Sequence, residues 1–546
     1  MNIGEIGVVG LGTMGAGIAE VFARAGLQVT AVEADPGALS KGMAILDRSL
    51  RKQLSRGRLT QDEYAEIADR VRPGPAIASL SGADLVIEVV PERLEIKRSV
   101  IAELDRVLQP SAIIATNTSS LSVTAIAAGS AHPGRVVGMH YFTPAPRMRL
   151  VEVVTTVLTE SAVADAVTSL AGRLGKTPVR VTDRAGFVAN ALLLPYLNHA
   201  VRLLETGYAT RDDIDLAVTA GIGLPMGPLA LLDLIGLDTS LAILEVLERE
   251  FGGSRYVPAP LLRRLTDAGR TGRKSGAGFY DYGEQATGGT KGPTSAEDPS
   301  LPAAPGTVTL IDPAAEPGSG SGAGVPEGQP SERAAELASL IAAQGISVTR
   351  NPAHPSDLII VAIGPEGGVL GPARTTGRAD HAVGLHLPVR GLASDAPGSR
   401  RSAAGQPSGT DAAGGLAELV PSPVTSERAI ATARALAGRL GLRAVRSADR
   451  PGLLVGALLF AHIKDAVTMV ADGYTTPDGV DSAMTLGCGY PRGPMRLLAD
   501  AGPGEALRVL TTMHAGYGDP AFAPPPLLRD YAVGGLAPGL PPHPRQ

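Results

Sequence analysis

The chain has 546 residues, of which 44% are hydrophobic and 19% charged, which allows several packed domains and excludes global disorder. The formal net charge of -5 gives no basic footprint for nucleic acid or an anionic membrane, and no run of about 18 apolar residues predicts a membrane span. The single cysteine, Cys488, excludes an intrachain disulfide and a cysteine-rich metal site. Together with an N-terminus that lacks a basic signal-peptide region, it fits a reducing, cytoplasmic location. We therefore expect no metal, nucleic acid or membrane partner.

The N-terminal segment has the pattern of a dinucleotide-binding unit. An apolar strand over Ile6–Val9 is followed by glycines at positions 10, 12 and 15, by a helix over Met14–Ala25 and by a second strand that ends at Glu33. Such glycines permit a tight turn, close approach of a pyrophosphate and packing of helix on strand. A carboxylate at Glu33 accepts from ribose hydroxyls and repels a 2′-phosphate, so NAD is favoured over NADP. The residues of the candidate cofactor loop are Gly10, Leu11, Gly12, Thr13, Met14 and Gly15.

Polar residues also follow later strands of this half. ATNTSSLSV, residues 115–123, predicts a strand that runs into a hydroxyl-rich turn, so Asn117, Ser119 and Ser120 either face a ligand or form a helix N-cap and turn. His140 ends an apolar run, and Glu152 lies in the next strand-like run. A histidine that removes a hydroxyl proton works best with a carboxylate that orients its ring. On spacing alone, however, a core histidine and an edge-strand glutamate fit better.

Two further polar positions leave alternatives open. Asn190 lies on a mostly apolar helix, where a buried amide needs partners; it bonds a substrate oxygen or caps a neighbouring turn. Lys97, five residues after Glu92, points toward the cofactor or only solvates a helix.

An internal repeat organises the rest of the chain. LAGRLGKTPVRVTDRAGFVANALL from residue 170 is matched by LAGRLGLRAVRSADRPGLLVGALL from residue 436, and TAGIGLPMGPLALL from residue 219 by TLGCGYPRGPMRLL from residue 485. Both offsets are 266 residues, whereas His386 follows His140 by 246. The second copy therefore carries an insertion after its histidine. The Gly-rich GSGSGAG near residue 318 shows no strand-turn-helix context and is not expected to bind a cofactor.

At this point residues 5–282, the first copy, resemble the 3-hydroxyacyl-CoA dehydrogenase family, particularly its 3-hydroxybutyryl-CoA dehydrogenase-like members. The matching motifs, in chain order, include GLGTMGAGIAEVFARAG, NTSSLSVTAIA, GMHYFTPAPRMRLVEVV, DRAGFVANALLLPYLNHAVRLLETGYAT and GRTGRKSGAGFYDY. The resemblance implies NAD-dependent, reversible oxidation of a (3S)-3-hydroxyacyl-CoA, an acyl-CoA of short chain, to the 3-oxoacyl-CoA. It places such an enzyme in fatty-acid metabolism.

The resemblance also implies roles for single residues. His140 corresponds to the general base and Glu152 to its carboxylate partner, while Ser119 and Asn190 bond the reacting oxygen or position the thioester. Contacts with NAD are implied for Glu33, Glu92, Lys97, Ser119 and Thr143, and contacts with coenzyme A for Ser49 and Arg56.

This chain departs from the family pattern at several of these positions. Thr143 stands where the family has an asparagine that contacts the cofactor, and Arg56 replaces a usual lysine. Ala191 stands where an arginine usually follows the Asn190 position. None of these changes removes the catalytic set.

The second copy resembles the same family in eroded form. His386 and Glu418 persist, but Gly456 stands where Asn190 stands in the first copy and no TNTSS segment precedes His386. We expect this copy to be catalytically silent and its helical part to pack on the first helical part. That packing forms an intramolecular pseudo-dimer, or else the chain is a homodimer.

The predicted fold is α/β: a Rossmann-like NAD-binding domain, an all-α domain, and a degenerate repeat that ends in a second all-α domain. The expected domains are a Rossmann domain over 1–183, a helical domain over 184–282, a linker over 283–330 that includes one possible strand, a Rossmann-like remnant over 331–448 with an insertion near 396–415, a second helical domain over 449–535 and a tail over 536–546.

Three alternatives stay open. One keeps the enzyme and changes the substrate to a dicarboxylic 3-hydroxyacyl-CoA of the 3-hydroxyadipyl-CoA type, as in aromatic-acid catabolism. Another is a β-hydroxyacid dehydrogenase that does not use coenzyme A; this class has a catalytic lysine at the Asn190 position, so His140 speaks against it. The last is a non-catalytic NAD-binding scaffold.

Overall fold

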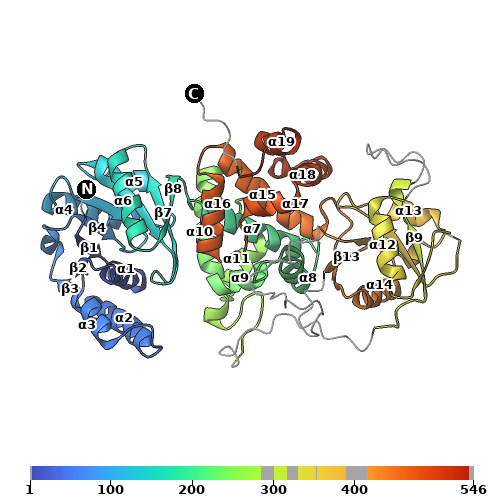
Figure 1. Cartoon of the computed structure of the whole chain (residues 1–546), viewed down its shortest axis with the longest axis horizontal. Coiled ribbons are helices and arrows are strands. Elements are labelled where there is room, and N and C mark those ends of the chain that lie inside the picture. The colour runs from blue at the N-terminus through green and yellow to red at the C-terminus, as the bar shows by residue number, and fades with distance from the viewer. Residues whose placement is uncertain (1–2, 284–300, 316–329, 352, 389–414, 540–546) are drawn as a thin grey trace, which may run out of the picture. The chain divides into compact units, whose positions relative to one another are not determined.

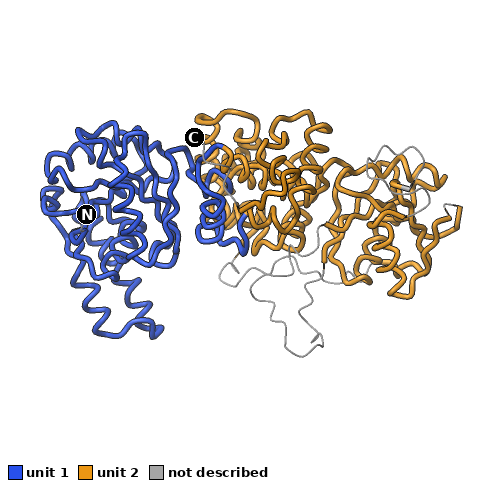
Figure 2. The backbone as a smooth tube through the Cα atoms, turned by 45° about the horizontal axis from the view of Figure 1, so that its top comes forward, with its two compact units in different colours: residues 1–193, 472–493, 543–546 blue, residues 194–471, 494–542 orange. Residues whose placement is uncertain are grey.

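The computed structural model describes residues 3–283, 301–315, 330–351, 353–388 and 415–539, which form two compact units (Figures 1 and 2). Of these residues, unit 1 comprises 3–193 and 472–493, and unit 2 comprises the described residues between 194 and 471 together with 494–539. In the part of the chain that the structure describes, each unit contains one sheet. Both copies of the repeat contribute residues to both units.

Unit 1 is built around an eight-stranded sheet of order β3-β2-β1-β4-β5-β6-β7-β8. All neighbouring strands are parallel except β6 and β7, which are antiparallel. The strands are β1 Glu5–Val9, β2 Gln28–Val32, β3 Val71–Gly74, β4 Leu85–Glu88, β5 Ile113–Thr116, β6 Val136–Tyr141, β7 Leu150–Thr155 and β8 Thr177–Thr182. The central strands are short apolar runs buried on both faces, as expected for a parallel sheet covered by helices.

The helices of this unit follow from strong local signals. Asp35 caps α2 by accepting from the Ala38 N–H, and Thr60 and Glu63 form a reciprocal capping box on α3. The helices that the N-terminal domain itself supplies are α1 Thr13–Arg24, α2 Pro36–Leu54, α3 Gln61–Asp69, α4 Leu94–Val107, α5 Val123–Ala127 and α6 Ser161–Arg173. Two apolar clusters fill the space between helices and sheet. The predicted Rossmann-like fold of the N-terminal domain is confirmed.

The second sheet has six strands in the order β10-β9-β11-β12-β13-β14. Its only antiparallel pair is β12 with β13, which corresponds to β6 with β7 of the first sheet. The strands are β9 Thr307–Ile311, β10 Ser347–Thr349, β11 Leu358–Ala362, β12 Ala382–His386, β13 Leu416–Pro421 and β14 Arg443–Arg446, and the accompanying helices are α12 Glu332–Ala342, α13 Leu370–Thr375 and α14 Glu427–Arg439.

The segment 283–330 holds more structure than a linker. Its apolar run, the possible strand of the sequence prediction, is β9, which lies inside the second sheet between β10 and β11. The second sheet therefore begins before residue 331; Pro- and Gly-rich flanks obscured this because they interrupt the apolar pattern around a short strand. β9 precedes the Gly-rich GSGSGAG in the chain and α12 follows it, so this segment does lie between a strand and a helix, contrary to the sequence analysis. That segment itself, like the insertion near 396–415 except for its last residue, lies outside the described residues.

Helices of both copies complete the molecule. Those of the first copy are α7 Ala189–Glu205, α8 Arg211–Leu216, the π-helix η3 Ala217–Ile222, α9 Pro228–Ile235, α10 Leu237–Phe251 and α11 Pro260–Asp267, and those of the second are α15 Leu453–Ala471, α16 Pro477–Cys488, α17 Pro494–Ala501, α18 Pro503–Tyr517 and α19 Pro526–Val533. Among the described residues, only α15 has the length and apolarity of a membrane span, and 78% of that stretch is buried inside the protein, as in a core helix.

Within unit 2 the two helical parts are in direct contact. The ring centroids of Tyr196 and His462 lie 4.8 Å apart, and Arg255 of the first copy forms an ion pair with Asp465 of the second. The two copies also line a shared cavity of about 480 Å³.

Prediction: Gly15→Ala destabilises unit 1, whereas Gly12→Ala does not. A Cβ at Gly15 lies 1.9 Å from the Gly10 carbonyl oxygen, while no atom lies within 4 Å of a Cβ at Gly12. Overpacking of this kind costs about 1–3 kcal/mol. Urea unfolding of the two variants beside the wild type checks the difference. Equal midpoints for Gly15→Ala and wild type contradict the packing role of Gly15.

Candidate active site

A histidine and a glutamate face each other across two antiparallel strands. His140 of β6 pairs with Glu152 of β7 in the strand register, and the His140 Nδ1 lies 2.7 Å from the Glu152 Oε2. The glutamate is fully buried and the histidine is 6% exposed. The structure thus brings together two residues whose spacing alone favoured a core histidine and an edge-strand glutamate. The carboxylate fixes the ring and leaves Nε2 as the nitrogen that exchanges a proton.

The other oxygen of Glu152 is held by the chain that leads into α7. Oε1 accepts from the backbone N–H groups of Val188 and Ala189, both at 3.0 Å. Phe187, just before them, has a φ of +46°, a left-handed conformation that bulky residues rarely adopt. Its ring centroid lies 5.5 Å from that of His140. Phe187 was not predicted as a site residue, because a positive φ at a non-glycine leaves no sequence signal.

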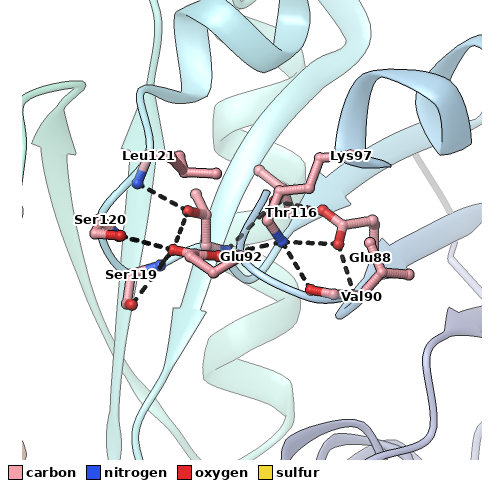
Figure 3. Close-up of polar contacts among 9 residues, drawn as sticks. Glu88, Val90, Glu92, Lys97, Thr116, Ser119, Ser120 and Leu121 are labelled. Atoms are coloured by element: carbon pink, nitrogen blue, oxygen red, sulfur yellow. Dashed lines mark hydrogen bonds and ion pairs between the residues drawn. The ribbon is translucent and has the colours of Figure 1, made fainter. Parts of the chain in front are cut away.

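Glu92 organises the turn that carries Ser119. Its Oε1 accepts from the Thr118 hydroxyl at 2.7 Å and from the backbone N–H groups of Ser119 at 2.9 Å and Ser120 at 3.0 Å (Figure 3). Burial opposes ionisation of Glu92, but the charge of Lys97 and these hydrogen bonds outweigh it and lower the pKa of the carboxyl. The turn therefore has a charged anchor that holds its backbone in place.

Lys97 lies beneath this turn and is almost completely buried. Its Nζ is 2.8 Å from Glu88 Oε1, 3.2 Å from the Val90 carbonyl oxygen and 3.4 Å from Glu92 Oε2 (Figure 3). The ammonium is thus surrounded by three oxygens of the protein. The geometry makes Lys97 and Glu92 supports of the Ser119 turn, and their contact with NAD stays a prediction. Glu88 was missed as a member of this group, although its place at the end of an apolar strand was a usable signal.

Asn117 and Asp183 connect the Ser119 turn to its surroundings. The Asn117 Oδ1 accepts from the Tyr141 N–H at 2.8 Å, which ties the turn to the strand of His140. Asp183, at the end of β8, accepts from the Ser122 hydroxyl at 2.8 Å and from the N–H of Thr124 at 2.6 Å, at the start of α5. Asp183 was also missed, although its match at Asp449 in the repeat marked it.

The glycine loop has the shape that a dinucleotide requires. Gly10 has a φ of +96°, and Gly12 is the N-cap of α1 with no side-chain cap and open space above it. The Glu33 Oε2 accepts from the Leu11 N–H at 2.8 Å, so the acid lies beside the loop as predicted from spacing. An open helix N-terminus of this kind fits a pyrophosphate.

The other predicted site residues lie on three elements. Asn190 is the second residue of α7 and half-buried, directly after the N–H groups that hold Glu152. The Thr143 hydroxyl lies 2.9 Å from Met14 Sδ and so joins the chain after β6 to α1. Ser49 lies on α2, and Arg56 follows that helix and is exposed. Among the described residues no cluster of three or more His, Cys, Asp or Glu is arranged to hold a metal.

The second copy keeps the frame of this site and loses its histidine–carboxylate bond. Glu418 accepts from the N–H groups of Leu454 and Val455, as Glu152 does from its own pair. Leu453 repeats the positive φ, at +48°. The His386 Nδ1, however, lies 3.2 Å from the Ile363 carbonyl oxygen, and its Nε2 is 3.8 Å from Glu418 Oε2.

Burial favours the neutral form of both members of this second pair. It lowers the pKa of His386 to about 4 and raises the pKa of Glu418 to about 7. Both shifts oppose the ion pair that a base and its carboxylate partner form.

Prediction: Glu418→Gln stabilises unit 2 at alkaline pH and not at acidic pH. The folded-state pKa lies above the ordinary value of 4.5, so the stability that Glu418 contributes is complete below that value and is lost as the pH rises through about 7. The gain is at most about 3 kcal/mol, since one pKa unit corresponds to about 1.4 kcal/mol. Thermal unfolding at about pH 5 and about pH 8 checks this. An identical shift at both pH values contradicts it.

Sequence comparisons place both halves in one family. The model described as 3-hydroxyacyl-CoA dehydrogenase, NAD binding domain, matches residues 5–184. The model described as 3-hydroxyacyl-CoA dehydrogenase, C-terminal domain, matches twice, at residues 186–282 and 452–537. The second match agrees with the repeat found in the sequence.

Individual relatives match either the first copy or the whole chain. A 3-hydroxybutyryl-CoA dehydrogenase of Mycobacterium tuberculosis is 45% identical over 282 residues, 51% of this chain and 99% of the relative. A 3-hydroxyadipyl-CoA dehydrogenase of Escherichia coli is 31% identical over 542 residues, 98% of each chain. The crystal structure of a 3-hydroxybutyryl-CoA dehydrogenase from Escherichia coli covers 98% of this chain and 99% of its own, with a TM-score of 0.74 and 29% identity. The chain therefore belongs to the NAD-dependent 3-hydroxyacyl-CoA dehydrogenases.

Proposed function

We propose that the first copy oxidises short-chain (3S)-3-hydroxyacyl-CoA, with 3-hydroxybutyryl-CoA as the best substrate, reversibly and with His140 as general base. The observation that carries this proposal is the buried bond between His140 and Glu152. The 45% identity of this copy to a 3-hydroxybutyryl-CoA dehydrogenase supports the short acyl chain. The net charge of -5, which gives no basic footprint for nucleic acid, supports a small-molecule substrate.

His140 performs the proton transfer. With Nδ1 bonded to Glu152, its Nε2 takes the proton of the C3 hydroxyl, and the buried carboxylate stabilises the imidazolium that forms. The two N–H groups on Glu152 Oε1 hold that carboxylate in place. Ser119 and Asn190 hold the C3 oxygen and the thioester in position, Ser119 on a turn anchored by Glu92 and Asn190 on the helix that follows the Glu152 contacts.

Separate sets of residues are suited to bind NAD and the coenzyme A part of the substrate. The loop from Gly10 to Gly15 would hold the pyrophosphate and Glu33 the ribose, with Thr143 nearby through its contact with Met14. NAD bound there would supply the acceptor for the hydride from C3. Ser49 and Arg56 contact the coenzyme A moiety. Four exposed cations on or just after α2 support this, since none has a carboxylate within ion-pair distance among the described residues: Lys41, Arg48, Lys52 and Arg56.

The second copy is proposed to be catalytically silent. Its His386 Nδ1 lies against the Ile363 carbonyl oxygen instead of Glu418, so the bond between base and carboxylate partner is missing. Its retained helices pack on those of the first copy within one chain, which supports the proposed intramolecular pseudo-dimer.

Prediction: His140→Gln lowers the turnover number by on the order of a hundredfold or more, because the general base is lost. His386→Gln is the matched control and keeps wild-type turnover. NADH formation from NAD and (3S)-3-hydroxybutyryl-CoA measures both, and NAD binding by titration confirms that each variant retains the cofactor site. Wild-type turnover by His140→Gln contradicts the proposed role. If wild-type protein binds NAD but turns over no CoA ester, a binding scaffold replaces the enzyme.

A dicarboxylic substrate of the 3-hydroxyadipyl-CoA type is the second candidate. It is favoured by one observation: the relative that matches 98% of the chain, including the second copy, is a 3-hydroxyadipyl-CoA dehydrogenase. The ratio of kcat/KM for 3-hydroxyadipyl-CoA and 3-hydroxybutyryl-CoA decides between the two. A ratio well above one assigns the dicarboxylic substrate, and a ratio well below one assigns the short monocarboxylic one.

A further inference from the structure

Helix α16 belongs to the second copy in sequence and to unit 1 in space. By the repeat offset of 266 residues it corresponds to α8 and η3 of the first copy. It nevertheless packs on β7 and β8, the two strands at the end of the first sheet, and residues 472–493 belong to unit 1 (Figure 2). Strand β7 is the strand that carries Glu152. The second copy thus contributes a segment to the domain that holds the first copy's site.

Specific polar contacts fix this segment on the first sheet. The Tyr474 hydroxyl donates to the Arg184 carbonyl oxygen at 3.4 Å, and the Arg184 guanidinium lies 5.1 Å from the centre of the Tyr474 ring. Arg184 also lies 3.6 Å from the carboxylate of Asp472. The Thr475 hydroxyl donates to the Arg180 carbonyl oxygen at 3.2 Å. Arg184 lies in the segment after β8. The N–H groups of Val188 and Ala189, a few residues further along this segment, donate to Glu152.

The first copy makes the reciprocal contact in unit 2. Tyr208, which matches Tyr474 in the repeat, donates to the Leu453 carbonyl oxygen at 3.1 Å. Gly221 of η3, which matches Gly487, faces Leu416 and Val455, 2.9 and 3.0 Å from the position of a Cβ. Each copy therefore gives the same segment to the sheet of the other copy.

The C-terminal end of α16 reaches the surroundings of His140. A Cβ on Gly487 lies 2.6 Å from Leu150 Cδ2 and 3.3 Å from Phe142 Cε1. The Phe142 ring centroid is 4.5 Å from that of His140. Burial raises the pKa of the Cys488 thiol to about 12, and the negative charge of Glu152 adds to this shift. The last turn of α16 thus contacts Leu150 and Phe142, next to the His140–Glu152 pair. It is also close enough to Glu152 for that carboxylate to influence the Cys488 thiol.

We propose that the second copy completes the catalytic centre of the first, with Gly487 as a positioning residue that sets Phe142 against His140. The inference rests on the proposed function of His140. The absence of a side chain at Gly487 lets α16 lie against Leu150 and Phe142, and Phe142 in turn limits the movement of the imidazole. The second copy, which lacks its own histidine–carboxylate bond, is retained in this view because its α16 forms a wall of the working site.

Gly487→Ala and its matched control Gly221→Ala test the proposal in the full-length chain. Both add one methyl group at a tight helix-to-sheet contact, so we expect similar losses of thermal stability. Gly487→Ala alone lowers kcat by on the order of tenfold or more, because small displacements of a catalytic group are costly. NAD affinity stays unchanged in both. Equal kcat values for the two variants overturn the proposal.

A second measurement needs no catalytic activity and remains informative if Gly487→Ala does not fold. Cys488 is the only cysteine of the chain, so alkylation by iodoacetamide reports on this residue alone. We expect Glu152→Gln to speed alkylation at alkaline pH several-fold, because loss of the carboxylate charge favours the thiolate. Glu418→Gln, the matched control, leaves the rate unchanged. Identical alkylation rates in wild type and both variants would show that α16 is not part of the site and overturn the proposal. If the alkylation rates are as expected but wild type does not turn over the CoA substrate, only the proposed function is rejected.

Discussion

The fully buried carboxylate of Glu152 is the constraint on which the rest of the site depends. A charge in a protein interior is tolerated only when its oxygens are fully engaged. One oxygen bonds the His140 ring and the other receives two backbone N–H groups, so three segments of the chain must meet at this point. The antiparallel register of β6 and β7 supplies the first partner. The left-handed turn at Phe187 aims the other two inward before α7 begins.

Much of this arrangement was readable from the residues. The glycine spacing and the position of Glu33 predicted the loop and its neighbouring acid, because both follow from rules of local backbone geometry. The constant 266-residue offset predicted two related helical parts. The bond between His140 and Glu152 was beyond the sequence pattern alone, because strand register depends on pairing over the whole sheet. The family resemblance indicated it.

Other features had no local signal. Glu92 and Lys97 were assigned to the cofactor, but their nearest partners are protein groups that hold the Ser119 turn. That arrangement is a tertiary one, in which Glu92 and Lys97, neighbours in sequence, meet a turn that lies more than 20 residues further along the chain. The placement of α16 on the first sheet was equally hidden. A repeat tells which segments are alike and does not tell which sheet each of them covers.

The two copies show how little separates a working dyad from a silent one. Both carry a buried glutamate that receives two N–H groups, and in both a residue with a positive φ comes directly before those N–H groups. In the second copy the imidazole bonds a backbone carbonyl through Nδ1, and the carboxylate is left without its cationic partner. The frame persists because it also joins sheet to helix, a structural role that does not depend on proton transfer.

The reciprocal exchange of segments between the copies has a consequence for mass action. When two separate chains exchange such segments, the fraction in the assembled state depends on how concentrated the protein is. Here donor and acceptor are joined covalently, so the exchange is governed by an effective concentration set by the connecting chain. Dilution does not separate them.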